Sequence, residues 1–227
     1  MSPACLALPA LLLLASEAGG LYFEQLTTSS SAGRAAGPGV ASRVWYAGRR
    51  MRLEAGAAGA GSALILQLDL GKAYRLDPEA RTVTPLDLER LRSRAHMDAA
   101  MAGDLMGVGA EGGRSSALSG ERRIAGHRCR GFRIAAGGAV LHVYVATDVP
   151  VGVEAFADFM EWSGAALSFG GLLEEIRKLP GLPLETRSRV SVLGVDHETV
   201  SSVTRLEVGP QPAERFEPPA GWRVLSE

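Results

Sequence analysis

The sequence predicts an α+β fold in which antiparallel strands dominate. Apolar and polar residues alternate with a period of two through most of the chain. The segments between these runs are short and contain Gly, Pro or Asp. Helical spacing appears only around residues 86–106 and 153–179. Strands and helices do not alternate in the way that builds a parallel sheet, so neighbouring strands are expected to pair antiparallel.

The first residues predict an export signal that is not part of the fold. Residues 6–15 form an apolar run that is too short to span a bilayer. Residues 16–18, Ser-Glu-Ala, follow it and fit the small-x-small rule for cleavage. We therefore expect residues 1–18 to be a signal peptide that is cleaved near Ala18. Residues 19–227 are expected to form one domain, located in the periplasm or secreted.

Charge and cysteine content exclude several classes of protein. The formal net charge of the chain is −1 at pH 7. Cleavage removes a single charged residue, Glu17, and leaves a net charge of zero. Because the arginines form no extended basic cluster, we expect no nucleic-acid partner. Only Cys129 remains after cleavage, so the core is expected to hold without an intrachain disulfide.

The first β block consists of short segments with alternating polarity. The expected strands are 21–26, 42–54, 64–70, 73–76 and 81–85. We expect a flexible loop at 27–40 and a bend or bulge at Gly48. The Gly71-Lys72 turn is short enough to join its two strands into an antiparallel meander.

Two strand faces in this block are candidates for the wall of an internal cavity. They consist of Trp45, Met51 and Leu53 in the segment 42–54 and of Leu64, Leu66 and Leu68 in the next strand. Each set follows the period of two that places side chains on one side of a sheet. The spacing leaves open which of the two faces is concave.

The second half of the chain continues the β-rich pattern around two helical regions. The expected elements are a helix at 86–106, a loop at 107–120, strands at 122–134 and 140–147, helices within 153–179, and a hairpin at 183–208. Gly126 and Gly131 fall inside the strand 122–134, and Gly137-Gly138 is expected to form the turn that follows it.

Two local motifs are interpreted as structural features. The run GVGAEG at residues 107–112 matches a dinucleotide-binding pattern, but such a site requires a strand before it and a helix after it. His127 and Cys129 point the same way from one strand, yet no second Cys and no His at ligand spacing accompany them. With no nucleophile–base pair or metal-ligand set in the sequence, we expect no enzyme, no metal and no cofactor.

The predicted helices carry flexible and aromatic side chains that suit an apolar pocket. These side chains are Met97, Met101, Phe156, Phe159, Met160 and Trp162. Thioethers and aromatic rings adapt to apolar ligands of varied shape. The alternative is that they belong to a core packed under the sheet. Together with the six strand residues they form the candidate ligand cavity.

Several stretches, in order along the chain, carry a resemblance to a known family. They are YFEQ at 22–25, VWYAGRRMRLE at 44–54, LDLGKAYRLDPEARTVTPL at 68–86, RRIAGHRCRGFRI at 122–134, VYVATDVPV at 143–151 and RFEPPAGW at 215–222. Together they resemble an uncharacterised exported bacterial family within the superfamily of the outer-membrane lipoprotein carrier LolA, the lipoprotein LppX and the sigma-factor regulator RseB. The resemblance implies a strongly curved antiparallel sheet, an unclosed half-barrel whose concave face is covered by helices.

The function implied by this resemblance is binding without catalysis. A LolA-like protein would be a periplasmic carrier or sensor for an apolar ligand, such as a lipid, an acyl chain or a lipoprotein. The alternative is an RseB-like regulatory module that contacts a protein partner and has no small-molecule ligand. Peripheral contact with the membrane or with envelope proteins would fit either function, and a monomer is expected.

Overall fold

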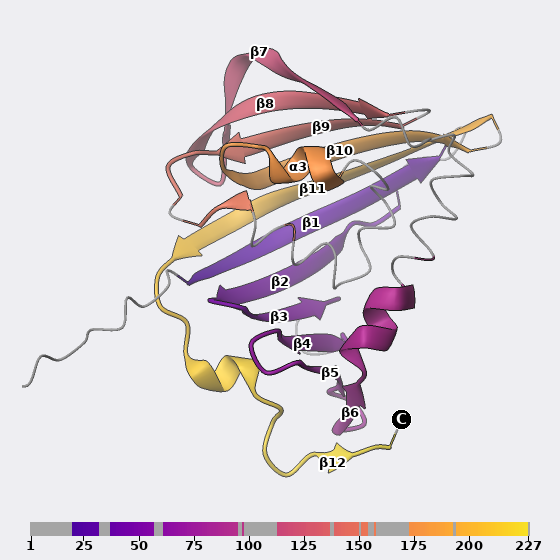
Figure 1. Cartoon of the computed structure of the whole chain (residues 1–227), viewed down its shortest axis with the longest axis vertical. Coiled ribbons are helices and arrows are strands. Elements are labelled where there is room, and N and C mark those ends of the chain that lie inside the picture. Colours follow the sequence, from indigo (N-terminus) through magenta and orange to yellow (C-terminus); the bar gives the residue numbers. More distant parts are fainter. Residues whose placement is uncertain are drawn as a thin grey trace, which may run out of the picture.

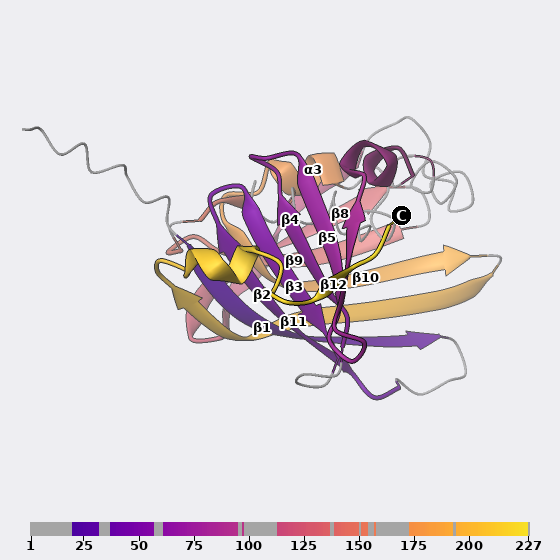
Figure 2. The same ribbon diagram turned by 90° about the horizontal axis from the view of Figure 1, so that it is seen from below.

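One curved sheet forms the frame of the protein (Figure 1). The computed structural model describes residues 20–31, 37–56, 61–94, 97, 113–136, 139–149, 151–153, 157, 173–192 and 194–226. Within these residues, 12 strands lie in the order β12-β6-β5-β4-β3-β2-β1-β11-β10-β9-β8-β7. The sheet bends strongly and its edges β12 and β7 do not meet, so it is an unclosed half-barrel (Figure 2). This confirms the predicted β-dominated class and the half-barrel.

The meander predicted for the first part of the chain is confirmed. Its strands are β1 (Leu21–Ser31), β2 (Val40–Ala47), β3 (Arg50–Ala55), β4 (Ala63–Gln67), β5 (Lys72–Asp77) and β6 (Thr82–Leu86). Each strand pairs antiparallel with the next one along the chain. Both β1 and β2 extend into the segment 27–40, which was predicted as a loop.

The second predicted strand is a hairpin and not a single bent strand. Gly48 and Arg49 form a two-residue turn between β2 and β3. Gly48 has a φ of 60°, which glycine adopts without steric cost at the first position of such a turn. Met51 pairs with Tyr46 and shares its face. Trp45 precedes Tyr46 in β2, so it points to the opposite face from Met51.

The second half of the sheet contains five longer strands. They are β7 (Arg114–Ile124), β8 (His127–Ala136), β9 (Ala139–Ala146), β10 (Leu182–Val192) and β11 (Val195–Val208). The prediction of one strand over 122–134 is wrong, because Ala125 and Gly126 form a turn inside it, with φ values of 49° and 88°. Residues 114–120, predicted as loop, belong to β7.

The two halves join through a pairing between distant parts of the sequence. The first strand, β1, lies between β2 and β11 and pairs antiparallel with both. At the C-terminus, η3 (Ala213–Phe216) is followed by the short β12 (Arg223–Val224). Among the described strands, only β12 pairs in parallel, with β6. These two strands are far apart in the sequence, so the prediction for neighbouring strands does not cover this pairing.

The helices lie on the concave side of the sheet. Residues 88–94 are helical, and α3 spans Leu173–Arg177. Figure 2 shows both inside the curve of the sheet. The remaining described helical residues are 97, 153 and 157, so most of the two predicted helical regions lies outside the described residues. None of the described helices is long and apolar enough to cross a membrane.

The C-terminal segment covers the outer face of the meander. Figure 2 shows residues 209–226 crossing the sheet on the side away from α3. Under this segment, Phe216 is 1% exposed and its carbonyl accepts a hydrogen bond of 2.9 Å from Gln67 Nε2. Trp222 packs against a buried cluster that includes Ile65 and Leu76. The outer face of β4 and β5 therefore carries a buried core beneath this segment.

Candidate functional site

Two rows of apolar side chains cross the concave face. The first row runs in register from β1 to β6 through Leu21, Tyr46, Met51, Leu66, Ala73 and Leu86. The second row runs from β11 to β4 through Leu206, Phe23, Val44, Leu53 and Leu64. Residues directly opposite one another share a face, and all of these belong to one apolar cluster. The inner side of the half-barrel thus carries a continuous apolar surface.

Part of this inner surface remains exposed. Leu53 and Leu64, the last two members of the second row, remain partly exposed. On the outer face, Ile65 and Leu76 are both 0% exposed. Apolar side chains that stay partly exposed in a concave surface provide contact area for an apolar ligand. We call the two rows, with the residues that pack against them, the inner apolar surface.

The helix at residues 88–94 covers one end of the inner apolar surface. Asp87 caps the helix, because its Oδ1 accepts a hydrogen bond of 3.1 Å from the backbone N–H of Arg90. Leu88 is buried and Leu91 partly buried, and both pack against the inner cluster. The cap orients the helix so that its apolar side faces the sheet.

Most of the strand residues predicted for the cavity lie on the inner apolar surface. Met51, Leu53, Leu64 and Leu66 belong to the two rows, and Leu68 packs against them from the turn after β4. The two strand faces that the sequence offered as alternatives are therefore the same face. Met51 and Leu66, at 4% and 1% exposed, form its floor.

Trp45 does not lie on the inner apolar surface, so its prediction as a cavity residue is wrong. It faces outward, where its ring centroid lies 5.0 Å from that of Tyr22. The cause is the turn at Gly48, which places Trp45 and Met51 in different strands. The predicted grouping required one uninterrupted strand.

The predicted helix residues are mostly outside the described part of the chain. Met97 is described, and its side chain is 62% exposed. The others, Met101, Phe156, Phe159, Met160 and Trp162, lie outside the described residues. Their place in a cavity remains a prediction.

Several residues of the inner apolar surface were not predicted. They are Leu21, Phe23, Val44, Tyr46, Ala73, Leu86, Leu91 and Leu206. Tyr46 shares the face of Met51 because of the turn at Gly48, where a bend within one strand was expected. Phe23 and Leu206 meet through the pairing of β1 with β11, which no local periodicity signals. In both hairpins the sequence shows a glycine at the turn, in Gly48-Arg49 and in Ala125-Gly126, and this glycine could have indicated the turn.

A band of hydroxyl side chains borders the second row. Thr27 of β1 pairs with Ser201 of β11, which pairs with Thr186 of β10. The Thr27 and Ser201 hydroxyls are 2.5 Å apart, and Gln25 Nε2 donates to both at 3.2 Å. Beyond the band, α3 packs Ile176 onto a second apolar cluster. The concave face therefore alternates between apolar and polar zones.

The thiol of Cys129, which the sequence places on the same side of a strand as His127, is buried and protonated. Cys129 is 0% exposed, and burial, with the nearby Asp148 carboxylate, raises the pKa of its thiol to about 11. His127 Nδ1 lies 3.2 Å from Asp148 Oδ2 and is not bonded to the thiol. A protonated thiol is a poor nucleophile and metal ligand. Among the described residues, no group of three or more His, Cys, Asp or Glu could hold a metal ion.

Comparisons with known proteins give solved structures of similar shape but no match in sequence. No protein-family model matches the chain, and no curated protein matches its sequence. An uncharacterised conserved protein from Thermus thermophilus is similar in structure, with a TM-score of 0.45 and 10% identity over 92% of this chain and 91% of that one. MucB gives a TM-score of 0.46 and 14% identity over 93% of this chain, which spans 61% of MucB. A LolA superfamily protein from Nitrosomonas europaea gives 0.35 and 10% identity over 87% of this chain and 90% of that one.

Proposed function

We propose that the protein is a non-catalytic binding protein that holds an apolar ligand, such as an acyl chain, on its inner apolar surface. The observation that carries the proposal is the partial exposure of Leu53 and Leu64 inside the concave face, whereas Ile65 and Leu76 on the outer face of β4 and β5 are fully buried. Burying such side chains against a ligand contributes about 25 cal/mol per Å² of apolar area. The protein would act as a carrier or a sensor of lipids or lipoproteins.

The hydroxyl band supports an amphipathic ligand over a pure hydrocarbon. Gln25, Thr27 and Ser201 lie beside the apolar rows and are all partly exposed. Gln25 Nε2 and one of the two hydroxyls donate within the band. The second hydroxyl hydrogen and the Gln25 amide oxygen are left to bond an ester, amide or carboxyl group at the end of an acyl chain. A fatty acid is therefore the simplest probe that matches both zones.

Fatty-acid uptake by two Leu→Ala variants on neighbouring strands tests the proposal. Leu64 of β4 is partly exposed on the inner face, whereas Leu76 of β5 is fully buried on the outer face. Leu64→Ala is expected to weaken binding of a fluorescent fatty acid by about three- to tenfold, because part of the apolar contact area is lost. Leu76→Ala is expected to leave binding unchanged and to lower the free energy of unfolding by about 2–5 kcal/mol.

Urea unfolding of the same variants provides the control. Leu64→Ala should lower stability by clearly less than Leu76→Ala, because a side chain beside open space loses fewer packed neighbours. Absence of saturable uptake by the wild type, together with equal stability losses, would show that the inner apolar surface is an ordinary packed core.

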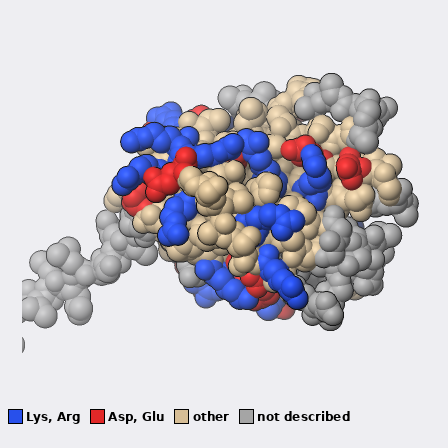
Figure 3. All heavy atoms as spheres, turned by 90° about the horizontal axis from the view of Figure 1, so that it is seen from above, with Lys and Arg blue, Asp and Glu red and all other residues tan. Residues whose placement is uncertain are grey.

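An interaction module is the second candidate, and the edge strand β7 favours it. Nine of the residues 114–123 in this strand are exposed and only Leu118 is partly buried. Among the described strands, β7 is the last one at its end of the sheet. Within the hairpin β7–β8, the arginines outnumber the single acidic residue, Glu121. Figure 3, viewed from the β7 side, shows many basic side chains on this end of the molecule. An acidic extended segment of a partner could pair with such an edge. This function takes precedence if the wild type binds no apolar probe.

We also propose that the protein acts after export, in the periplasm or outside the cell. The support is the apolar run at residues 6–15 and the small residues that follow it. The mature chain should begin at or near Gly19. N-terminal sequencing of the protein from its own cell envelope tests this, and retention of Met1 would refute it.

A further inference from the structure

A charged hollow lies on the outer face of the sheet, opposite the inner apolar surface. It has a volume of about 280 Å³. Its walls include Arg43, Arg52, Glu54, Pro78, Arg215 and Trp222. The strands β2 and β3 supply one wall, and the C-terminal segment supplies the other through Arg215 and Trp222. The binding of an apolar ligand on the inner face makes no use of these groups.

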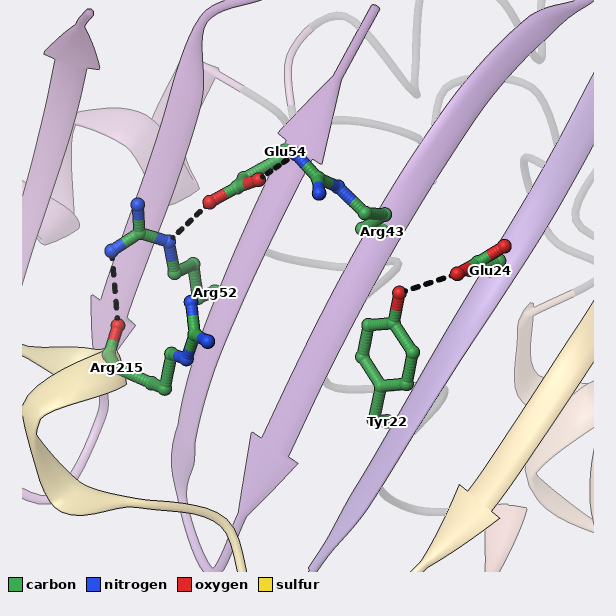
Figure 4. A network of polar contacts seen from close by, with 6 residues as sticks. All are labelled: Tyr22, Glu24, Arg43, Arg52, Glu54 and Arg215. Carbon is green, nitrogen blue, oxygen red and sulfur yellow. Dashed lines mark hydrogen bonds and ion pairs between the residues drawn. The ribbon is translucent and has the colours of Figure 1, made fainter. Parts of the chain in front are cut away.

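One carboxylate is shared by two arginines in this hollow (Figure 4). Arg43 Nη2 lies 2.7 Å from Glu54 Oε2, and Arg52 Nε lies 2.9 Å from Glu54 Oε1. Arg52 also donates to the backbone carbonyl of Arg215 at 3.2 Å. The Arg52 and Glu54 side chains are 15% and 20% exposed, so water screens their charges only in part.

The third guanidinium has no carboxylate partner within the described part of the chain. The Arg215 guanidinium lies 5.2 Å from the centroid of the Trp45 ring, and Arg43 lies 5.8 Å from the same ring. The ring holds both cations by cation–π attraction. Trp45 is itself fixed, at 7% exposed and against Tyr22. A stacked guanidinium keeps its N–H groups free to bind an anion in its plane.

We infer that this hollow binds a phosphate monoester group. Three guanidinium groups face one carboxylate, which leaves a formal charge of +2 in the hollow. A phosphate monoester carries a charge of about −1.5 to −2 near neutral pH, and guanidinium forks bind its oxygens in pairs. Trp222 and Pro78 provide an apolar wall for the organic part of the ligand. The hollow is slightly smaller than typical drug-sized sites of about 300–1,000 Å³, which suits a compact ester.

Tryptophan fluorescence of the full chain, titrated with phenyl phosphate, tests this site. Trp222 lines the hollow and Trp45 lies under two of its cations, so binding should change the emission saturably. Arg215→Gln removes the unpaired cation and should weaken binding by about tenfold or more, as expected for a hydrogen bond to a charged group. Inorganic phosphate should compete with phenyl phosphate.

Arg205→Gln is the matched control. The Arg205 guanidinium also stacks on an outer-face ring, 5.8 Å from the centroid of Tyr22, but it does not line the hollow. Its substitution should leave the affinity unchanged. Arg43→Gln replaces Arg215→Gln if circular dichroism shows that the latter does not fold.

Three results would overturn the inference. The first is a wild type that gives no saturable response up to the solubility limit of phenyl phosphate. The second is an equal loss of affinity in Arg205→Gln, which would show a general effect of positive charge. The third is equal affinity for benzoate, since a monoanion would then suffice. Fatty-acid uptake occurs on the other face and is measured separately, so neither test decides the other.

Discussion

The ionisation of the Cys129 thiol makes the stability of the protein depend on pH. Its burial raises the pKa from 9.0 to about 11 in the folded chain. In the unfolded chain the thiol ionises at its ordinary pKa, whereas in the folded protein it keeps its proton up to a higher pH. The resulting contribution to stability is therefore fully present below pH 9 and is lost as the pH rises through 11.

Comparison of the wild type with Cys129→Ala should reveal this loss. Both proteins change with pH through their other groups, and the difference between them isolates the thiol. The stability advantage of the wild type should decrease by about 2–3 kcal/mol between pH 8 and 11, since each pKa unit corresponds to about 1.4 kcal/mol. Urea unfolding at several pH values measures it. If the free energies of unfolding of the two proteins differ by the same amount at every pH in this range, the raised pKa is contradicted.

At the scale of elements, tight turns determine which side chains share a face. The β7–β8 turn has positive φ at both central residues, 49° at Ala125 and 88° at Gly126. This is the geometry of a type I′ turn, for which Asn-Gly is the favoured sequence. Ala125 therefore occupies a left-handed conformation that costs an L-residue roughly 1 kcal/mol.

Ala125→Asn is expected to stabilise the protein. Asn tolerates the left-handed region better than Ala, so the free energy of unfolding should rise by about 0.5–1 kcal/mol. Urea unfolding provides the measurement. Gly126→Ala is the complementary change and should destabilise the protein, because its φ of 88° disfavours any side chain. A loss of stability in Ala125→Asn would mean that the turn has another geometry.

At the scale of the whole molecule, the C-terminal segment holds the outer face of the meander closed. Phe216 is buried at 1% exposed, and its carbonyl bonds to Gln67, which is equally buried. Further along, the backbone N–H groups of Arg223 and Leu225 donate to the carbonyls of Arg81 and Val83. One end of the chain thus shields the sheet edge and completes a core formed by residues far away in sequence.

Phe216→Ala should weaken the attachment of the C-terminal segment and lower the free energy of unfolding. Truncating a buried aromatic side chain costs about 3–5 kcal/mol, because neighbours cannot fill the void. The exposed Val224, at 66%, is the control within the same segment, and Val224→Ala should change stability by less than about 0.5 kcal/mol. Thermal or urea unfolding measures both. Similar values for the two variants would show that the segment is only loosely attached.

Much of the fold was predictable from local pattern. The meander, the C-terminal hairpin and the grouping of Leu64 with Leu66 on one strand face all follow from alternation with a period of two. That Leu53 shares this face follows only from the pairing of β3 with β4. Predictions failed where a two-residue turn interrupted the alternation. Trp45 was therefore placed on the wrong face, since a turn and a bend look alike in an alternating sequence.

The sequence by itself determined the β-rich class, the antiparallel pairing of strands that follow one another and the apolar faces of single strands, because these depend on neighbours along the chain. Only the tertiary structure decided that β1 lies between β2 and β11. It also decided that Arg43 and Arg215 meet over Trp45. The contact of Arg52 with Arg215 joins residues 163 positions apart. Such contacts arise when curvature and packing bring distant segments together, which local periodicity does not encode.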